Sequence, residues 1–225
     1  MKWLLDPFFI LGVYLLLVTY VIDRPVEKVG LSLACSIVPF QLVIASVVSG
    51  LVAIDTRRSM ITNMTFDRSL IPVAVTLTEG AAFLASLCLL ALMMAVYRVA
   101  PTVAILWLPL VLVVNLVLAL SMAVPATLFG VWLPDLRGFA ISLVRTLYFL
   151  APGLVPLSAA PSRSRDVLRL NPFTGLFEAY RSVIVYGVPP VAWMIAFPLL
   201  WAALLGAVFG PIYAREQRHF AKVLG

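Results

Sequence analysis

Two ionisable side chains lie within long apolar stretches of this chain, where a charge is expensive and therefore suggests a function. Glu79 falls in the stretch Leu70–Tyr97, and Arg145 falls in Phe139–Leu157. Acids and bases inside a bilayer often carry protons, ions or charged substrates. The alternative is structural: each side chain packs in a helix bundle with a partner or extends to the membrane surface. One residue of each sign is too few for a proton-coupled carrier.

The sequence contains none of the motifs that carry common enzyme chemistry. It has no GxxxxGK[ST] loop for nucleotide phosphates, no HExxH and no GxSxG. Cys35 and Cys88 lie in apolar stretches, and His219 is the single histidine, so these residues predict no zinc or iron site. We therefore expect no catalytic residue, no metal and no cofactor in this chain.

The composition indicates a membrane protein. Of 225 residues, 63% are hydrophobic and 12% are charged, about half the charged share of soluble domains. A spanning helix needs about 20 apolar residues, and it satisfies its own backbone groups in lipid. Six stretches qualify: about 4–22, 29–54, 70–97, 101–131, 139–157 and 191–213. The sequence predicts an all-α integral membrane protein with six transmembrane helices in one domain, residues 1–225.

Charge gives only a weak indication of orientation. The first stretch lacks a small-residue cleavage site before Asp23, so it predicts a span rather than a cleaved signal peptide. The net charge of +6 fits topology and lipid headgroups better than nucleic acid. The two tightest basic clusters, Arg57-Arg58 and Arg215–Lys222, fall on the same side as both termini. We predict that this side is cytosolic.

The connection Asp55–Ser69 is the longest polar segment between two spans. Met60, Ile61 and Met64 are spaced so that one face of a short helix would be apolar. The pattern predicts either an amphipathic helix on the membrane surface, able to dock a partner, or an ordinary solvated loop.

The segment between the fifth and sixth spans is too apolar for a soluble loop and too interrupted for a seventh span. Asn171 and Pro172 form a good helix start, with Asn as N-cap and Pro as the first helical residue. An apolar helical face follows, formed by Phe173, Leu176, Phe177, Tyr180, Val183 and Ile184. Glu178 and Arg181 are spaced for an ion pair on the opposite side. We predict an interfacial or re-entrant helix on the outer side.

Several runs of residues resemble one family along nearly the whole chain. The most specific is Leu170–Arg181, LNPFTGLFEAYR, preceded by Pro134–Arg137 and Tyr148–Pro152. Weaker matches are Trp3–Phe9 with Val13-Tyr14, Asn63 with Phe66–Pro72, and Phe220–Leu224. Together they resemble the ABC transporter type 2 permeases that export polysaccharides such as O-antigen, capsule and teichoic acid.

This resemblance implies a six-span half-transporter that forms a homodimer in the inner membrane with both termini cytosolic. Two separate ATPase subunits would bind ATP and Mg. A cytosolic coupling helix would lie at about Thr56–Asp67, and outer re-entrant helices at about Ala159–Tyr186. The residues implied for contact with the ATPase are Thr56, Arg57, Arg58, Asn63, Phe66 and Asp67. Those implied for the re-entrant motif are Asn171, Pro172, Glu178 and Arg181. Members usually also carry an amphipathic helix before the first span, and the stretch before Trp3 is too short for one.

The substrate expected from the resemblance is a lipid-linked glycan. Arg137 and Arg145 are candidates to attract its diphosphate, because arginine binds phosphate oxygens through two N–H groups. Asp135 and Arg137 otherwise suit a turn at the membrane surface. Tyr14, Tyr20, Tyr148 and Phe149 are candidates to line the glycan path by stacking on sugar rings; packing and a membrane-interface belt are the alternatives.

Two other functions fit the same residues. One is a permease of this architecture that exports a hydrophobic small molecule or drug. The other is a membrane enzyme acting on lipid-linked sugars, which the shortage of acidic residues at the membrane face disfavours.

Overall fold

The computed structural model describes residues 9, 12, 13, 28–64, 66–153, 156–159 and 161–220. Within these ranges the chain is helical and contains no strand. The predicted first span, with Tyr14 and Tyr20, lies almost entirely outside the described residues. The predicted all-α class is confirmed for the part that is described.

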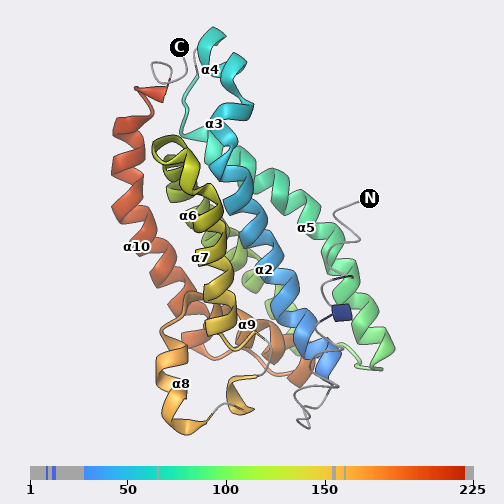
Figure 1. Cartoon of the computed structure of the whole chain (residues 1–225). Helices are drawn as coiled ribbons and strands as arrows, with labels where there is room; N and C mark the ends of the chain where they lie inside the picture. The colour runs from blue at the N-terminus through green and yellow to red at the C-terminus, as the bar shows by residue number, and fades with distance from the viewer. Residues whose placement is uncertain are drawn as a thin grey trace.

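In the described part of the chain, four helices are long and apolar enough to cross a membrane. They are α2 (Val29–Leu51), α5 (Leu70–Val96), α6 (Leu108–Trp132) with the 3-10 turn η2 (Val103–Trp107) before it, and α10 (Ala192–Glu216). They coincide with the predicted second, third, fourth and sixth spans. The chain is therefore a multi-pass membrane protein (Figure 1).

The predicted fifth span, Phe139–Leu157, is wrong at its far end. Helix α7 covers Arg137–Leu150, which is 14 residues, or roughly 21 Å of the 30 Å bilayer core. It ends there because Pro152 disfavours helical backbone at the residue before it. Ala151 is accordingly extended, with ψ of 161°.

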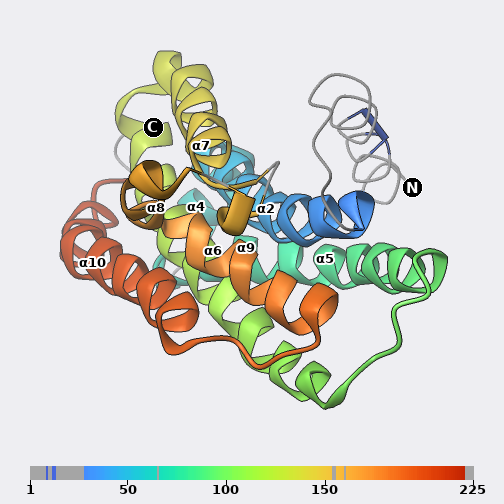
Figure 2. The same ribbon diagram turned by 90° about the horizontal axis from the view of Figure 1, so that it is seen from below.

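Helix α2 lies at the centre of the bundle. It contacts α5, α6, α7 and α9 (Pro172–Arg181). In its most apolar stretch, 72% of the residues are buried. The corresponding share is 22% in α5, 33% in η2–α6 and 11% in α10. The view from below in Figure 2 shows α9 lying across one end of the bundle among α2, α6 and α10, near the short helix α8 (Ser162–Arg169). This end is called the α9 end.

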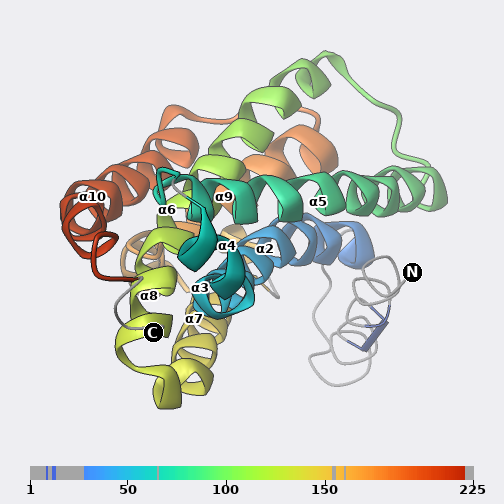
Figure 3. The ribbon, with the colours of Figure 1, turned by 90° about the horizontal axis from the view of Figure 1, so that it is seen from above.

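The opposite end carries the connection between α2 and α5. It forms two short helices, α3 (Ala53–Thr56) and α4 (Arg58–Asn63), which lie over the ends of the spans in Figure 3. A small apolar core, separate from the main one, joins them to α5, α6 and α10. Its buried members are Ala53, Ile54, Ile61, Ile71, Val75, Leu128, Tyr213 and Phe220. This end is called the α4 end.

The ends of α2 and α6 touch backbone to backbone at Gly130. A Cβ placed on Gly130 would lie 2.0 Å from the carbonyl oxygen of Leu51. No side chain can occupy that space, so glycine is the one residue that permits this crossing. The contact fixes the last turn of α2 against the last turn of α6.

We expect Gly130→Ala to destabilise the protein by about 3 kcal/mol or more, because the methyl group forces α2 and α6 apart. The measurement is the free energy of unfolding in detergent micelles. Gly206→Ala is the matched control, since a Cβ on this helical glycine meets nothing within 4 Å. The control should range from no change to a gain of about 1 kcal/mol. Equal stability of the two variants would contradict the crossing.

Candidate functional site

Helix α9 begins as the sequence predicts. The Asn171 side-chain oxygen accepts a hydrogen bond from the Phe173 N–H at 3.0 Å, and Pro172 occupies the first helical position. The Asn171 amide also donates to the Leu147 carbonyl oxygen at 2.7 Å. One N-cap residue therefore starts α9 and holds the last turn of α7 beside it.

All ten residues of α9 are buried, including Glu178 and Arg181 on the side opposite the predicted apolar face. Its surroundings supply partners on every side: α2 and α6 contact it, and α10 crosses it at Gly175. A Cβ on Gly175 would come within 2.9 Å of the Met194 carbonyl oxygen. A short helix that does not span the bilayer is tolerated within a membrane when protein surrounds it.

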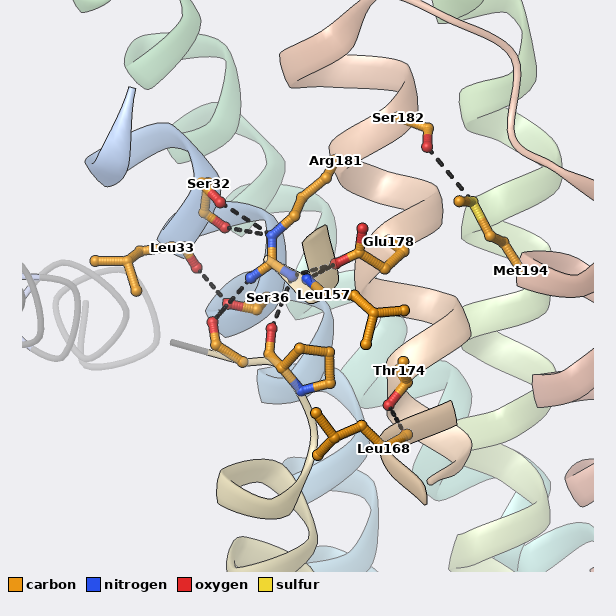
Figure 4. A network of polar contacts seen from close by, with 12 residues as sticks. Ser32, Leu33, Ser36, Leu157, Leu168, Thr174, Glu178, Arg181, Ser182 and Met194 are labelled. Atoms are coloured by element: carbon orange, nitrogen blue, oxygen red, sulfur yellow. Dashed lines mark hydrogen bonds and ion pairs between the residues drawn. The ribbon is translucent and has the colours of Figure 1, made fainter. Parts of the chain in front are cut away.

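The guanidinium of Arg181 is the most deeply buried charge among the described residues, with no exposed surface. Its Nη1 donates to Glu178 Oε1 at 2.8 Å and to the Pro152 carbonyl oxygen at 2.7 Å. Its Nη2 donates to the Gly153 carbonyl oxygen at 3.0 Å, and its Nε donates to Ser32 Oγ at 3.0 Å. Figure 4 shows these partners converging on it from α2, α9 and the α7–α8 connection.

Glu178 and Ser36 complete the network around that connection. Glu178 Oε1 accepts a second hydrogen bond, from the Leu157 N–H at 3.0 Å. Ser36 Oγ on α2 donates to the Gly153 carbonyl oxygen at 2.5 Å. The predicted Glu178–Arg181 ion pair is therefore present, but it is buried and anchors backbone rather than facing solvent. Sequence spacing gave the pair, and no sequence signal identified Ser32 or Ser36 as its partners.

The two described aromatic candidates for a glycan path have different environments. Tyr148 is 3% exposed and packs against Phe40, with ring centroids 4.6 Å apart, and against Phe177 at 5.7 Å. Phe149 is 56% exposed. Burial leaves the ring of Tyr148 no face for a sugar, whereas more than half of the Phe149 side chain is exposed.

The two intramembrane charges do not meet. Glu79 on α5 accepts a hydrogen bond from Ser49 Oγ on α2 at 2.7 Å. Arg145 lies on the exposed side of α7. Helix α2 contacts both α5 and α7, and no ion pair joins Glu79 to Arg145 among the described residues. Glu79 thus has in Ser49 the hydrogen-bond partner that a structural role in the bundle would require.

Most of the residues implied for ATPase contact lie on α3, α4 and the chain after them. Thr56 Oγ1 donates to the Val52 carbonyl oxygen at 3.0 Å, and Arg57 Nη1 donates to that of Ala53 at 3.4 Å. Arg58 and Asn63 are exposed. Phe66, by contrast, packs against the small core.

Asp67 closes a local turn at the end of this segment. Its carboxylate accepts a hydrogen bond from the Ser69 N–H at 3.0 Å. This bond stabilises the charged form and lowers the pKa of Asp67 below its usual value. Asp67 and Phe66 thus shape the return of the chain into α5.

Of the three residues of the predicted apolar face, one packs onto the bundle and two point outward. Only Ile61 is buried, while Met60 is 46% exposed and Met64 58% exposed. The helix α4 is short, and one buried residue suffices to seat it on the small core. Both methionines therefore lie on the outer surface of the α4 end, beside the exposed Arg58 and Asn63.

Two residues that the sequence did not single out tie this end to α10. Arg68 Nη1 donates to the Gln217 carbonyl oxygen at 2.6 Å. The Tyr213 hydroxyl donates to the Arg68 carbonyl oxygen at 2.9 Å. Arg68 and Tyr213 are far apart in the sequence and belong to no periodic pattern, so only the fold reveals this link.

Arg137 is occupied by protein partners. Its Nη2 lies 2.5 Å from Asp55 Oδ2 and 2.6 Å from the Gly130 carbonyl oxygen, to which Nε also donates at 3.2 Å. Asp55 and Gly130 thus engage Nε and Nη2, so a bidentate grip on a phosphate through these two nitrogens would have to displace them.

Comparison with known proteins identifies similar chains over almost the full length. One relative is the O-antigen export system permease protein RfbA of Myxococcus xanthus, 27% identical over 97% of this chain and 85% of its own. Two Klebsiella pneumoniae proteins of the same name are 20% and 19% identical over the same shares. No protein-family model matches the chain. The predicted resemblance is confirmed.

The relatives also decide between transporter and enzyme. Each is named a permease, which confirms the prediction of a transporter subunit over that of a membrane enzyme. Among the described residues, no group of three or more His, Cys, Asp and Glu could hold a metal ion.

We expect Arg181→Ala to cost about 3–5 kcal/mol of stability, because it leaves Glu178 buried without its counter-charge. The double variant Arg181→Met/Glu178→Leu should cost less than the single one, since it removes both charges. Unfolding in detergent micelles measures both.

The matched control is Arg169→Ala in α8, which breaks an exposed i,i+3 pair with Asp166 and a cation–π contact with the Trp193 ring. It should cost about 1 kcal/mol or less. A loss at Arg181 no larger than at Arg169 would show that the buried network does not hold the α9 end.

Proposed function

We propose that this chain is the membrane permease of an ATP-driven exporter that moves a lipid-linked polysaccharide across the inner membrane. The observation that carries the proposal is similarity over 97% of the chain to O-antigen export permeases. The chain has no nucleotide-binding loop, so ATP would be bound and hydrolysed, with Mg, by a separate ABC ATPase subunit. The permease would work as a homodimer.

The proposed topology has six spans with both termini in the cytosol. The four candidate spans, α7 and the apolar stretch 4–22 supply the six. The α4 end would be cytosolic, because it brings together the basic clusters at Arg57-Arg58 and after Tyr213. The α4 helix and the described C-terminal end lie at the same end of the bundle in Figure 1. The α9 end would face outward, with α8 and α9 as its re-entrant elements.

Segment α3–α4 would receive the motion of the ATPase. It is the part of the α4 end that projects beyond the spans, and it is held on them by Ile61 and Phe66. Its outward surface combines flexible methionines with polar groups, a composition suited to a protein partner. Arg58, Met60, Asn63 and Met64 would make that contact.

Helix α7 would face the glycan path and the second permease. Its only buried residues are Val144 and Tyr148, and Phe139, Leu143 and Phe149 are all more than half exposed. Arg145, exposed on the same helix, would be the cation that meets the diphosphate. Phe149 would offer its ring to a sugar.

Deletion of the gene in its host tests the proposed cargo. The expected result is loss of surface glycan with accumulation of lipid-linked glycan inside, because synthesis continues while export stops. Fractionation and blotting of the two pools measure this, with plasmid-borne wild type as the control. Normal surface glycan without an internal pool would reject the cargo and favour a small-molecule exporter.

We expect Met60→Asp/Met64→Asp to weaken binding of the ATPase subunit, because two carboxylates replace the apolar part of the contact. Co-purification of tagged permease with the ATPase measures this. Val167→Asp is the matched control, since Val167 is 68% exposed on α8 at the opposite end. If the α4 variant co-purifies with the ATPase as well as the wild type does, α4 is not part of the interface with the ATPase.

A further inference from the structure

Four backbone elements meet at one point of the α4 end. Leu51 ends α2, Asp55 lies in α3, Gly130 lies in the last turn of α6 and Arg137 begins α7. Leu51 and Gly130 touch through their backbones. Asp55 and Gly130 are joined through one side chain, the guanidinium of Arg137. These four residues are called the inner junction.

The inner junction connects a fixed part of the molecule with two lightly held ones. The ends of α2 and α6 are fixed by the Gly130 contact and by the burial of α2. Segment α3–α4 rests on them through a few apolar residues. Helix α7 has two buried residues along its length. Its far end is held by the Asn171 amide on the Leu147 carbonyl oxygen.

Arg137 is the direct link between the two lightly held parts. The 3-10 turn η3 (Pro134–Leu136) separates it from the end of α6, so it starts α7 while reaching back to α3. The side chains of Arg137 and Asp55 are 26% and 50% exposed. An ion pair this exposed adds little to the free energy of unfolding. Its effect is to hold the start of α7 beside α3.

We propose that Arg137 is a positioning residue that transmits displacement of α3–α4 to α7 through Asp55. This rests on the proposed function, in which the ATPase moves α4 and α7 faces the glycan. When α3 shifts, the Asp55 carboxylate draws the guanidinium with it, and the start of α7 follows. The Gly130 carbonyl oxygen, fixed at the end of α6, is the pivot. Arg137 therefore acts on α7 rather than on the substrate diphosphate.

The test uses the complete transporter with its ATPase subunits and measures glycan exported per ATP hydrolysed. Asp55→Asn and Arg137→Gln remove the charges while keeping similar size. Each should lower the ratio at least about fivefold, the lower end of coupling between sites in proteins. The double variant should be no worse than the worse single variant, because both break the same link.

Asp55→Asn separates this role from the alternatives. If Arg137 instead bound the diphosphate, removing Asp55 would free the cation, and export would stay normal or rise while Arg137→Gln abolished it. If the pair only supported folding, protein yield and ATP hydrolysis would fall with export, and the ratio would not change. Either result would overturn the proposal.

Asp166→Asn is the matched control, because it breaks an exposed arginine–carboxylate pair at the opposite end, with Arg169 at 3.2 Å in α8. It should leave the ratio at the wild-type value. A failure of the proposed function is distinguishable: the wild-type complex itself would then export no glycan. If the wild-type complex exports glycan and the ratio is unchanged in Asp55→Asn, only the positioning role is rejected.

Discussion

The buried guanidinium of Arg181 is the interaction on which the α9 end depends. A charge with no access to water must find a hydrogen-bond acceptor for each N–H group. Glu178, Ser32 and the carbonyl oxygens of Pro152 and Gly153 accept four hydrogen bonds from its five N–H groups. Satisfying one side chain thus fixes α2, α9 and the end of α7 relative to one another. The irregular connection after α7 is held against α2 and α9 because its carbonyl groups are the acceptors.

The two ends of the bundle use opposite solutions. At the α9 end, polar groups are enclosed, and all of α9 is buried. At the α4 end, a small apolar core seats α3 and α4 while their polar groups stay at the surface. Enclosed networks resist deformation, because each broken bond leaves a desolvated group. An exposed segment on a few contacts can shift at low cost. The α9 end is therefore rigid throughout, whereas the α4 end combines the fixed crossing of α2 and α6 with a surface segment, α3–α4.

Helix α7 lies between these two ends and is attached to both. Asn171 holds its last turn from the α9 end, and Arg137 ties its first residue to the α4 end. Little of its surface is buried between them. A helix that is weakly packed along its length and bonded at its ends can tilt without breaking the core. This arrangement suits the movement of α7 that the proposed function requires.

The sequence alone determined the class, most spans and the start of α9, because each depends on local signals. Long apolar runs set the spans, and an Asn-Pro pair suffices for an N-cap. Spacing alone also gave the Glu178–Arg181 pair. Only the tertiary structure decided that this pair is buried, that α7 stops at Leu150 and that Arg137 binds Asp55 and Gly130. Those facts depend on which residues meet across the bundle, such as Ser32 with Arg181. Contacts between residues so far apart in the sequence leave no periodic signal in a single chain.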